Sequence, residues 1–406
     1  MILKKIINTF VLLLKIFFFD LRAILIKKKP YVILVAEFGT EGGALTYFKY
    51  ILEYFETKQI SYVLVLSKEQ KLFVENKINI TYCMDILEGP DVWRPYFTEK
   101  NKLSYNLDLL INQLLELLFF SKLNVKYRPA YFYFSVTNPE HYVFEFCMTA
   151  KLFYVCHTLT NDAMDTLKYK ILNTFLQQRK NIIVVSHSAK KFLLKSWKIK
   201  TGKAKYIKVI YNYYNTIPND DVKKGKTKEF TVLTIGSVEP YKNPLLWCEV
   251  AKKMTEVYGI DKVKFFWLGN GSSKNECQQI VSSYPNIIFL GFCKNVESFY
   301  NISDVYMQPS ISESFGISVV GAMAHKIPCV VSNAGGLIEV VDNDETGFVI
   351  NEKNSEIYFN KLSHLLINPV EKIKMGESGY FKFRNEFTKQ HWYKNMDKLL
   401  FCDVER

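Results

Sequence analysis

The chain has 406 residues, of which 49% are apolar and 15% aromatic, with only 18 glycines and 12 prolines. This composition excludes a disordered or fibrous protein, and the length exceeds what one hydrophobic core usually serves, so two domains are expected. Lysine and arginine number 53 against 40 acidic residues, a formal charge of +13, which favours anionic partners. Because the chain has no arginine-rich arm, zinc-finger spacing or RNA-binding signature, we expect no nucleic-acid partner.

The first 29 residues are basic and apolar and contain no small-residue cleavage site, which argues against a removed signal peptide. On a helical projection one narrow polar stripe holds Lys4, Asn8, Lys15 and Arg22. Apolar residues lie opposite this stripe: Ile6, Phe10, Leu13, Phe17, Leu21 and Ile24. We therefore predict a membrane-associating helix over residues 1–29 that lies in the membrane plane, with the lysines of residues 27–29 at anionic head groups. A spanning signal-anchor and packing against protein remain alternatives.

Residues 30–213 alternate between strand-like and helical patterns, which predicts a first Rossmann-like domain with a parallel sheet covered on both faces. The expected strands are residues 31–36, 62–66, 130–136, 152–156, 182–185 and 206–210. The expected helices are residues 44–55, 103–120 and 165–178, the first of them after a glycine loop at residues 39–43.

A polar connector at residues 214–229 separates this domain from a second one at residues 230–384. There the expected strands are residues 230–235, 263–268, 287–290, 304–307, 328–331 and 347–350. Two doubly wound domains place their ligand crevices at the carboxyl ends of the strands, facing each other across a cleft. The last segment, residues 385–406, is expected to carry a helix at residues 385–400 that packs back onto the first domain.

The stretch SISESFGISVVGAMAHKIPCVVSNAGGLIEVV, residues 310–341, brings several chemical groups to one helix start. Glu313 and Gly316 follow an apolar strand, and residues 317–324 read as a helix. A carboxylate, a flexible glycine and free backbone N–H groups suit the recognition of hydroxyls and phosphates. The alternative is that Glu313 only caps the helix.

Further blocks occur in the order TIGSVEPYKN, FWLGNG, FLGFCKNV, ISDVYMQPSISESFGISVVGAMA, PCVVSNAGGLIEVV and ETGFVI. With them the chain resembles the retaining GT-B glycosyltransferases of the large group 1, family 4-like, nucleotide-sugar-dependent family. The resemblance is strongest at residues 230–350 and looser in the N-terminal half, where EFGTEGGALTYF, YVCHTL, VVSHSA and VIYNYYN carry it.

The resemblance implies three catalytic residues. Glu313 would accept hydrogen bonds from hydroxyls of the transferred sugar. Lys242 would stabilise the leaving diphosphate, and His157 would point at the reacting centre. By their residue types alone, Lys242 reads as a surface lysine and His157 as a structural histidine. Backbone amides of Ser314, Phe315, Gly316 and Ile317 would hold sugar and phosphate oxygens.

Other residues complete the donor site that the resemblance implies. Gly42 and Gly43 would let a phosphate or sugar approach the first helix closely. Asn270 lies in a Gly-Asn-Gly turn that could equally be structural, and Cys293 would border the nucleobase.

Two positions depart from the family. Gly321 stands where a second glutamate usually bonds the ribose, and Ser237 stands where an arginine usually assists the lysine. We expect an active enzyme that holds its donor differently.

The expected function is retaining, hexosyltransferase-type transfer of a sugar from a nucleoside diphosphate to a lipid-linked or surface-glycan acceptor. Such a reaction belongs to the synthesis of cell-surface polysaccharide, lipopolysaccharide or glycolipid. No metal or other cofactor is expected, because Lys242 and helix N-termini supply positive charge and no convincing D-x-D motif is present.

The eight cysteines contain no C-x-x-C pair, which indicates a reducing cytoplasm without a structural metal. We expect a peripheral location on the inner face of a bacterial cell membrane. Open alternatives are a catalytically silent GT-B relative that binds nucleotide sugar or serves in assembly, and a GT-B sugar-nucleotide epimerase.

Overall fold

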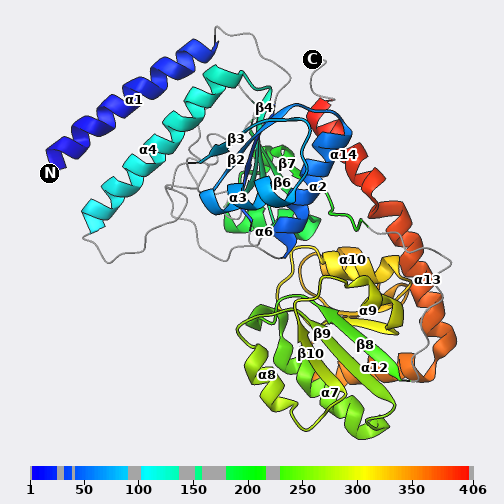
Figure 1. Cartoon of the computed structure of the whole chain (residues 1–406). Coiled ribbons are helices and arrows are strands. Elements are labelled where there is room, and N and C mark those ends of the chain that lie inside the picture. The colour runs from blue at the N-terminus through cyan, green and yellow to red at the C-terminus, as the bar shows by residue number, and fades with distance from the viewer. Residues whose placement is uncertain are drawn as a thin grey trace. The chain divides into compact units, whose positions relative to one another are not determined.

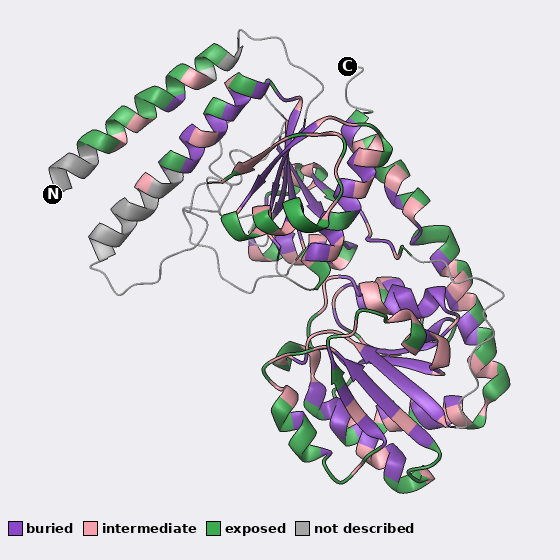
Figure 2. Ribbon diagram, in the orientation of Figure 1, coloured by how far each residue is buried: buried purple, intermediate pink, exposed green. Residues whose placement is uncertain are grey.

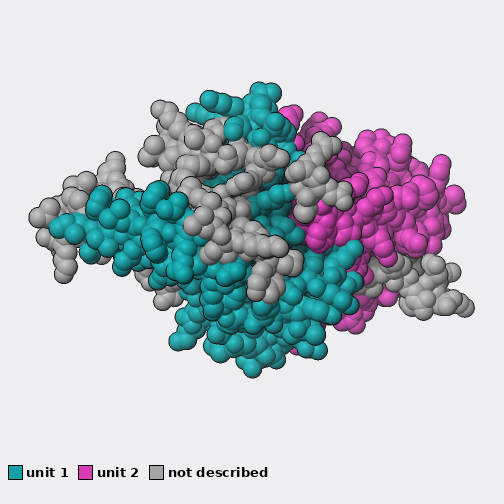
Figure 3. Space-filling model, turned by 90° about the horizontal axis from the view of Figure 1, so that it is seen from above, with its two compact units in different colours: residues 1–184, 192–208 teal, residues 185–191, 209–406 magenta. Residues whose placement is uncertain are grey.

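The computed structural model describes residues 2–24, 32–38, 42–89, 102–136, 151–157, 180–215 and 229–401. The chain forms two compact units, which Figure 3 colours separately. Unit 1 consists of residues 1–184 and 192–208, and unit 2 consists of residues 185–191 and 209–406. The predicted helix at residues 165–178, and residues 39–41 of the loop predicted at residues 39–43, lie outside the described residues.

Unit 1 is built on a seven-stranded sheet with the order β3-β2-β1-β4-β5-β6-β7 (Figure 1). Its strands are β1 (Val32–Ala36), β2 (Tyr62–Leu66), β3 (Cys83–Glu88), β4 (Tyr131–Val136), β5 (Lys151–Cys156), β6 (Lys180–Val184) and β7 (Ile207–Val209). The register pairs of β1, β2, β3, β4, β5 and β6 are all parallel. The order reverses between β1 and β4, which makes their carboxyl ends the switch point where doubly wound sheets hold ligands.

Apolar spacing and capping residues in the sequence explain helices of unit 1. They are α1 (Ile2–Ile24), α2 (Gly43–Thr57), α3 (Lys68–Lys77), α4 (Lys102–Tyr127) and α6 (His187–Ser196), with η3 (Thr201–Tyr206) before β7. The first turn of α6 belongs to unit 2. Helix α2 buries a regular apolar stripe, and α3 begins with a capping box in which Gln70 N donates to Ser67 Oγ and Ser67 N donates to Gln70 Oε1, both at 3.3 Å. Such a cap stabilises a helix by about 1 kcal/mol.

Helices α1 and α4 lie side by side (Figure 1). Ile16, Leu12 and Phe19 of α1 pack in a cluster with Leu114, Leu117 and Leu118 of α4. The sequence predicted the helix but not this packing partner. In the part of the chain that the structure describes, no helix has the length and apolar content needed to cross a membrane.

Unit 2 is built on a six-stranded parallel sheet with the order β10-β9-β8-β11-β12-β13. The strands are β8 (Phe230–Ile235), β9 (Val263–Leu268), β10 (Ile287–Gly291), β11 (Val305–Gln308), β12 (Cys329–Ser332) and β13 (Gly347–Ile350). The helices are η4 (Pro240–Lys242), α7 (Pro244–Tyr258), α8 (Lys274–Ile280), α9 (Glu297–Ile302), α10 (Ile317–Ala324), α11 (Leu337–Val340), α12 (Ser355–Ile367), α13 (Pro369–Glu386) and α14 (Lys389–Phe401).

The two faces of the unit 2 sheet carry separate cores, visible as purple strands between helices in Figure 2. One core gathers residues of α7, α8 and α12 around Trp247 and Trp267. The other gathers residues of α9, α10 and α13 around Tyr300 and Tyr306. The strand order reverses between β8 and β11, because α9 connects β10 to β11 across the sheet. Helix α10, which connects β11 to β12, packs on the same face as α9.

The predicted parallel Rossmann-like sheets are confirmed in both units. Three strands of unit 2, at residues 230–235, 263–268 and 347–350, have the predicted bounds. The prediction of one helix over residues 385–400 is wrong, because α13 ends at Glu386 and α14 begins at Lys389. Phe387 and Thr388 separate them, and the backbone oxygen of Thr388 accepts from Trp392 N at 3.1 Å. The predicted domain bounds and the packing of residues 385–406 on the first domain stay predictions.

Candidate functional site

Lys242 and Glu313 meet at the carboxyl ends of β8 and β11, the switch point of the unit 2 sheet. Lys242 Nζ forms an ion pair with Glu313 Oε2, and the two side chains are only 13% and 15% exposed. Gln308 Nε2, at the end of β11, donates to the same carboxylate oxygen at 2.6 Å. Because doubly wound sheets bind ligands in the crevice at this point, the pair is placed where a ligand is expected.

The Lys242 loop is fixed from two sides. Glu239 accepts hydrogen bonds from Ser272 N at 2.9 Å and from Ser272 Oγ at 2.5 Å, and the side-chain bond from Ser272 lowers the pKa of Glu239 below its usual range. Ile311 N donates to Tyr241 O at 2.7 Å, which ties this loop to the one that carries Glu313. The backbone that carries Lys242 is therefore held by contacts within its own region and by the neighbouring loop.

The Glu313 loop packs against two glycines whose lack of a side chain is required. A Cβ on Gly335 would lie 1.9 Å from Glu313 O, and a Cβ on Gly336 would lie 2.4 Å from Ser314 O. Gly336 N donates to Glu313 O at 2.9 Å, and Ser186 Oγ donates to Ser314 O at 2.7 Å. These contacts fix the backbone on both sides of the carboxylate.

Helix α10 begins directly after this loop, at Gly316, whose φ of 103° is a left-handed conformation suited to glycine. Val319 N and Val320 N donate to Gly316 O at 3.0 and 3.1 Å. Among the described residues, the backbone N–H groups of Gly316, Ile317 and Ser318 have no protein acceptor. Open N–H groups at a helix N-terminus form an anion-binding site.

Gly321 lies one turn further along α10 and is closely surrounded by aromatic side chains. A Cβ there would lie 2.6 Å from Tyr300 Oη and 2.8 Å from Tyr214 Cε2. Tyr300 donates to Ser318 O at 2.8 Å, and Tyr214 donates to Glu297 Oε1 at 2.7 Å, so both rings are held in place. The position that the family fills with a glutamate is therefore filled here by two tyrosines from other segments.

His325, at the end of α10, belongs to the same cluster. Its Nδ1 lies 2.7 Å from Gly321 O, its Nε2 lies 2.6 Å from Glu297 Oε2, and its ring stacks on Tyr300. His325 is itself buried, so it is part of the packing around Gly321.

Three other predicted donor residues line the same edge of the sheet. Ser237 Oγ lies 2.8 Å from Tyr241 Oη, so a hydroxyl pair occupies the position expected for an arginine. Asn270 Oδ1 accepts from Lys274 Nζ at 3.1 Å, while the glycines on either side of it pack against the backbone of residues 236–238. Cys293 is half-buried, and its Sγ lies 3.7 Å from Gly291 O.

Gly42, Gly43 and His157 belong to unit 1. Gly42 precedes α2 with a φ of 95°, and a Cβ on either glycine would meet nothing within 4 Å. His157 follows β5, and its ring lies 4.2 Å from the ring of Tyr47 with Nε2 3.5 Å from Ser135 Oγ. Loss of water around the imidazole lowers the pKa of His157 to about 4, so the ring is neutral at pH 7.

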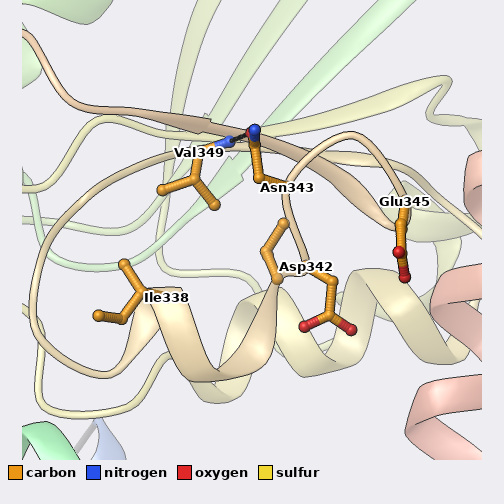
Figure 4. A pocket seen from close by; sticks show the side chains of 6 residues that line it. Ile338, Asp342, Asn343, Glu345 and Val349 are labelled. Atoms are coloured by element: carbon orange, nitrogen blue, oxygen red, sulfur yellow. Dashed lines mark hydrogen bonds between the residues drawn. The ribbon is translucent and has the colours of Figure 1, made fainter.

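A separate pocket of about 390 Å³ lies beside α11 and β13 and is lined by Ile338, Val341, Asp342, Asn343, Glu345 and Val349 (Figure 4). None of the predicted site residues lines it. Asn343 Oδ1 accepts from Val349 N at 2.8 Å, which stabilises the local turn, and Asp342 Oδ1 accepts from Lys382 Nζ of α13 at 2.7 Å.

The sequence did not predict the buried residues that hydrogen-bond to the strands carrying the site. Tyr306 Oη accepts from Ile235 N at 3.1 Å and lies 2.9 Å from Gln308 Oε1, which links β8 to β11 under the Lys242–Glu313 pair. Burial raises the pKa of Tyr306 far above its usual range, so it stays a neutral hydrogen-bonding group. The polar Gln308 at the end of an apolar strand was the one signal in the sequence.

Comparison with known proteins agrees with this geometry. Residues 216–381, about two-fifths of the chain, match the family model described as "Glycosyl transferases group 1". An Escherichia coli protein, UDP-Gal:alpha-D-GlcNAc-diphosphoundecaprenol alpha-1,3-galactosyltransferase, is 28% identical over 185 residues, which are 44% of this chain and 47% of that protein. The Staphylococcus aureus capsular polysaccharide biosynthesis glycosyltransferase CapM is 24% identical over 141 residues, 34% of this chain and 37% of that protein. The matches to these curated relatives thus span about half of their length or less.

Solved structures match over nearly the whole chain. Anabaena HepE in complex with UDP and glucose has a TM-score of 0.68 at 16% identity, covering 91% of this chain and 98% of that one. A Rickettsia africae glycosyltransferase has a TM-score of 0.73 at 15% identity, covering 94% and 100%. At these identities the likeness establishes the fold. Residues 216–381 thus match the glycosyl transferases group 1 family model, within a chain that has the two Rossmann-like sheets of the GT-B fold.

Proposed function

We propose that this chain is a glycosyltransferase that moves a sugar from a nucleoside diphosphate to an acceptor hydroxyl with retention of configuration. The observation that carries the proposal is the Lys242–Glu313 pair beside the open N–H groups of α10, at the switch point of the unit 2 sheet. At one crevice, a cation and a helix N-terminus suit the diphosphate of a nucleotide sugar, and a carboxylate suits its sugar hydroxyls.

In this proposal each group of the site has its own task. Lys242 leaves Glu313 for the diphosphate, where its charge stabilises the leaving group. Glu313 then accepts hydrogen bonds from sugar hydroxyls, with its orientation kept by Gln308. Backbone N–H groups of Ser314, Phe315, Gly316 and Ile317 hold sugar and phosphate oxygens.

The proposed chemical step breaks the bond between the anomeric carbon and the diphosphate oxygen and forms a bond from the acceptor oxygen on the same face. The acceptor proton passes to the leaving phosphate oxygen, and positive charge develops on the sugar ring. The pKa of His157 is lowered to about 4, so its imidazole is neutral. In this proposal a ring nitrogen directs its lone pair at the sugar ring, and the imidazole carries no positive charge that would repel the positive charge developing there. This retaining course needs no metal, since Lys242 and α10 supply the positive charge.

The proposed acceptor is a lipid-linked or surface glycan. Support comes from the names of two relatives, which refer to a diphosphoundecaprenol-linked sugar and to a capsular polysaccharide. We place the chain on the inner face of the cell membrane, attached peripherally through residues 1–29. This location would bring a soluble donor and a lipid-linked acceptor to the same surface.

The test uses the purified full chain with UDP-, GDP-, ADP- and CMP-sugars. First, thermal stabilisation identifies the donor. Transfer to a lipid extract is then measured for the wild type and for Glu313→Gln, with Glu276→Gln, an exposed carboxylate in the first turn of α8, as the matched control. We expect Glu313→Gln to lower turnover about a thousandfold and Glu276→Gln to leave it unchanged. NMR of the product's anomeric centre tests retention, and activity in a chelator tests the absence of a metal requirement.

A silent nucleotide-sugar-binding relative is the second candidate, and the filled space at Gly321 with the uncharged Ser237 favours it. Donor binding without transfer to any acceptor would support this candidate. Conversion of the donor alone into an epimer would instead indicate the epimerase.

A further inference from the structure

Helix α1 has one face that anchors it to the protein. Ile16 is only 6% exposed, and Leu12 and Phe19 are partly buried with it against α4. These three side chains recur at the spacing of one side of a helix. The packing fixes how α1 is turned about its own axis, and thereby fixes which side chains point away from α4.

The side of α1 away from α4 carries exposed apolar side chains; green marks the exposed residues along this helix in Figure 2. Eight large apolar side chains there are 41–63% exposed: Ile7, Phe10, Val11, Leu13, Leu14, Phe17, Phe18 and Leu21. The helix therefore has more apolar surface than α4 covers, and the surplus faces away from the protein. A continuous apolar face of this kind marks a binding surface.

A narrow cationic stripe runs between these two faces. Asn8, Lys15 and Arg22 are exposed on it, and in the sequence the lysines of residues 27–29 follow the helix. The uncharged run before Lys15 comprises only residues 6–14, far short of the ~20 residues that span a bilayer. Positive charge beside an exposed apolar face is the arrangement of helices that lie in the interface of an anionic membrane.

We propose that the outer face of α1 inserts into the interfacial region of an anionic lipid bilayer, while α4 attaches the helix to unit 1 through Ile16 and its neighbours. Lys15 and Arg22 then contact lipid phosphates at the edge of the inserted face. The proposal deepens the membrane contact of the proposed function by naming which side of the helix meets lipid. In this proposal α4 connects the membrane-bound helix to the sheet of unit 1. Its test does not depend on sugar transfer.

The experiment measures binding of the full chain to vesicles by co-sedimentation, with phosphatidylcholine alone or with 30% phosphatidylglycerol. The outer-face variant carries Phe10→Ser, Leu14→Ser and Phe17→Ser. We expect its partitioning to anionic vesicles to fall about a hundredfold. The matched control changes three exposed apolar residues of α13, Val370→Ser, Ile373→Ser and Phe381→Ser, and should bind like the wild type.

A charge variant, Lys15→Gln with Arg22→Gln, separates the two contributions. Its binding to anionic vesicles should fall about tenfold, with little change on pure phosphatidylcholine. An unchanged melting temperature, and unchanged thermal stabilisation by the nucleotide sugar that the donor screen identifies, verify that each variant is folded. A failed membrane test would then not count against the donor site.

Two results would overturn the proposal. The first is equal vesicle binding by the wild type and the outer-face variant. The second is a wild-type dimer that the outer-face variant converts to a monomer in sedimentation velocity while vesicle binding is unchanged, which would identify the face as an interface between copies of this chain.

Discussion

The carboxyl ends of the two sheets differ in how they present polar groups. In unit 2, Lys242 and Glu313 face each other as charges, and hydrogen bonds from Gln308 and from two backbone loops hold them. In unit 1, His157 lies against the aromatic ring of Tyr47, and its lowered pKa keeps it neutral. The same sheet architecture thus offers a charged edge in one unit and a neutral aromatic edge in the other. A charged edge suits a diphosphate, whereas a neutral edge suits uncharged hydroxyls and a developing cation.

Removing the charge of Lys242 should produce the largest effect. We expect Lys242→Met to lower turnover about a thousandfold, because the leaving diphosphate loses its fixed cation. Steady-state transfer measures the effect. Lys264→Met, on β9 beside Glu229, is the matched control, and equal losses in both variants would contradict a special role for the charged edge.

Acid should destabilise the neutral edge of unit 1. The pKa of His157 is lowered from 6.5 to about 4, so the unfolded chain binds a proton more readily than the folded chain between these values. Stability from this residue is present above pH 6.5 and is lost as pH falls toward 4, by up to about 3 kcal/mol. Denaturant unfolding of the wild type and His157→Gln at pH 7.5 and 4.5 measures it. A difference between the two proteins that does not change with pH would show that the ring is not kept neutral.

A methyl group at Gly321 should destabilise unit 2. Alanine usually stabilises a helix interior by about 1 kcal/mol relative to glycine, but here a Cβ would lie 2.6 Å from Tyr300 Oη. We expect Gly321→Ala to cost about 2 kcal/mol of unfolding free energy. Tyr300→Phe removes the colliding oxygen, so the double variant should recover part of the loss. A stabilised Gly321→Ala would show that the aromatic cluster has room for a side chain.

The smallest effect is expected at Ser237. Ser237→Arg adds a cation near the proposed diphosphate site and should tighten binding of the donor's free nucleotide about fivefold, the size of a partly exposed charge contact. Calorimetry in low and high salt measures this gain, which should shrink with salt. The nucleoside of the same base, which lacks phosphate, provides the control. If binding of this nucleoside tightened equally, the added arginine would act on the base or ribose.

The sequence predicted much of this molecule because many of its signals are local. Buried runs such as residues 230–235 and 263–268 specify strands wherever they occur, and a glycine before an apolar helix specifies the start of α10. Glu313 and Lys242 were predicted because their blocks are compact in sequence.

Contacts between distant segments could not be predicted in this way. Tyr214 and Tyr300 meet Gly321 from segments that are far apart in the chain, and the Gly335–Gly336 turn meets Glu313 only after β11 and β12 pair. The pattern of α1 likewise predicted an amphipathic helix but not that α4 would cover one of its sides. Each of these required the register of the sheets or the packing of a partner helix.

The start of α6 has a practical consequence for dissecting the protein. Ser186 Oγ donates to Ser314 O, and the N–H groups of His187 and Ser188 donate to Glu339 at 2.8 and 2.6 Å, all within unit 2. A fragment cut at the family boundary, residue 216, would omit residues 185–191 and leave the Glu339 carboxylate and the Ser314 carbonyl without these donors. Unit 2 is therefore discontinuous along the chain, and a truncated version that keeps its native loop beside Glu313 has to carry this short upstream segment with it.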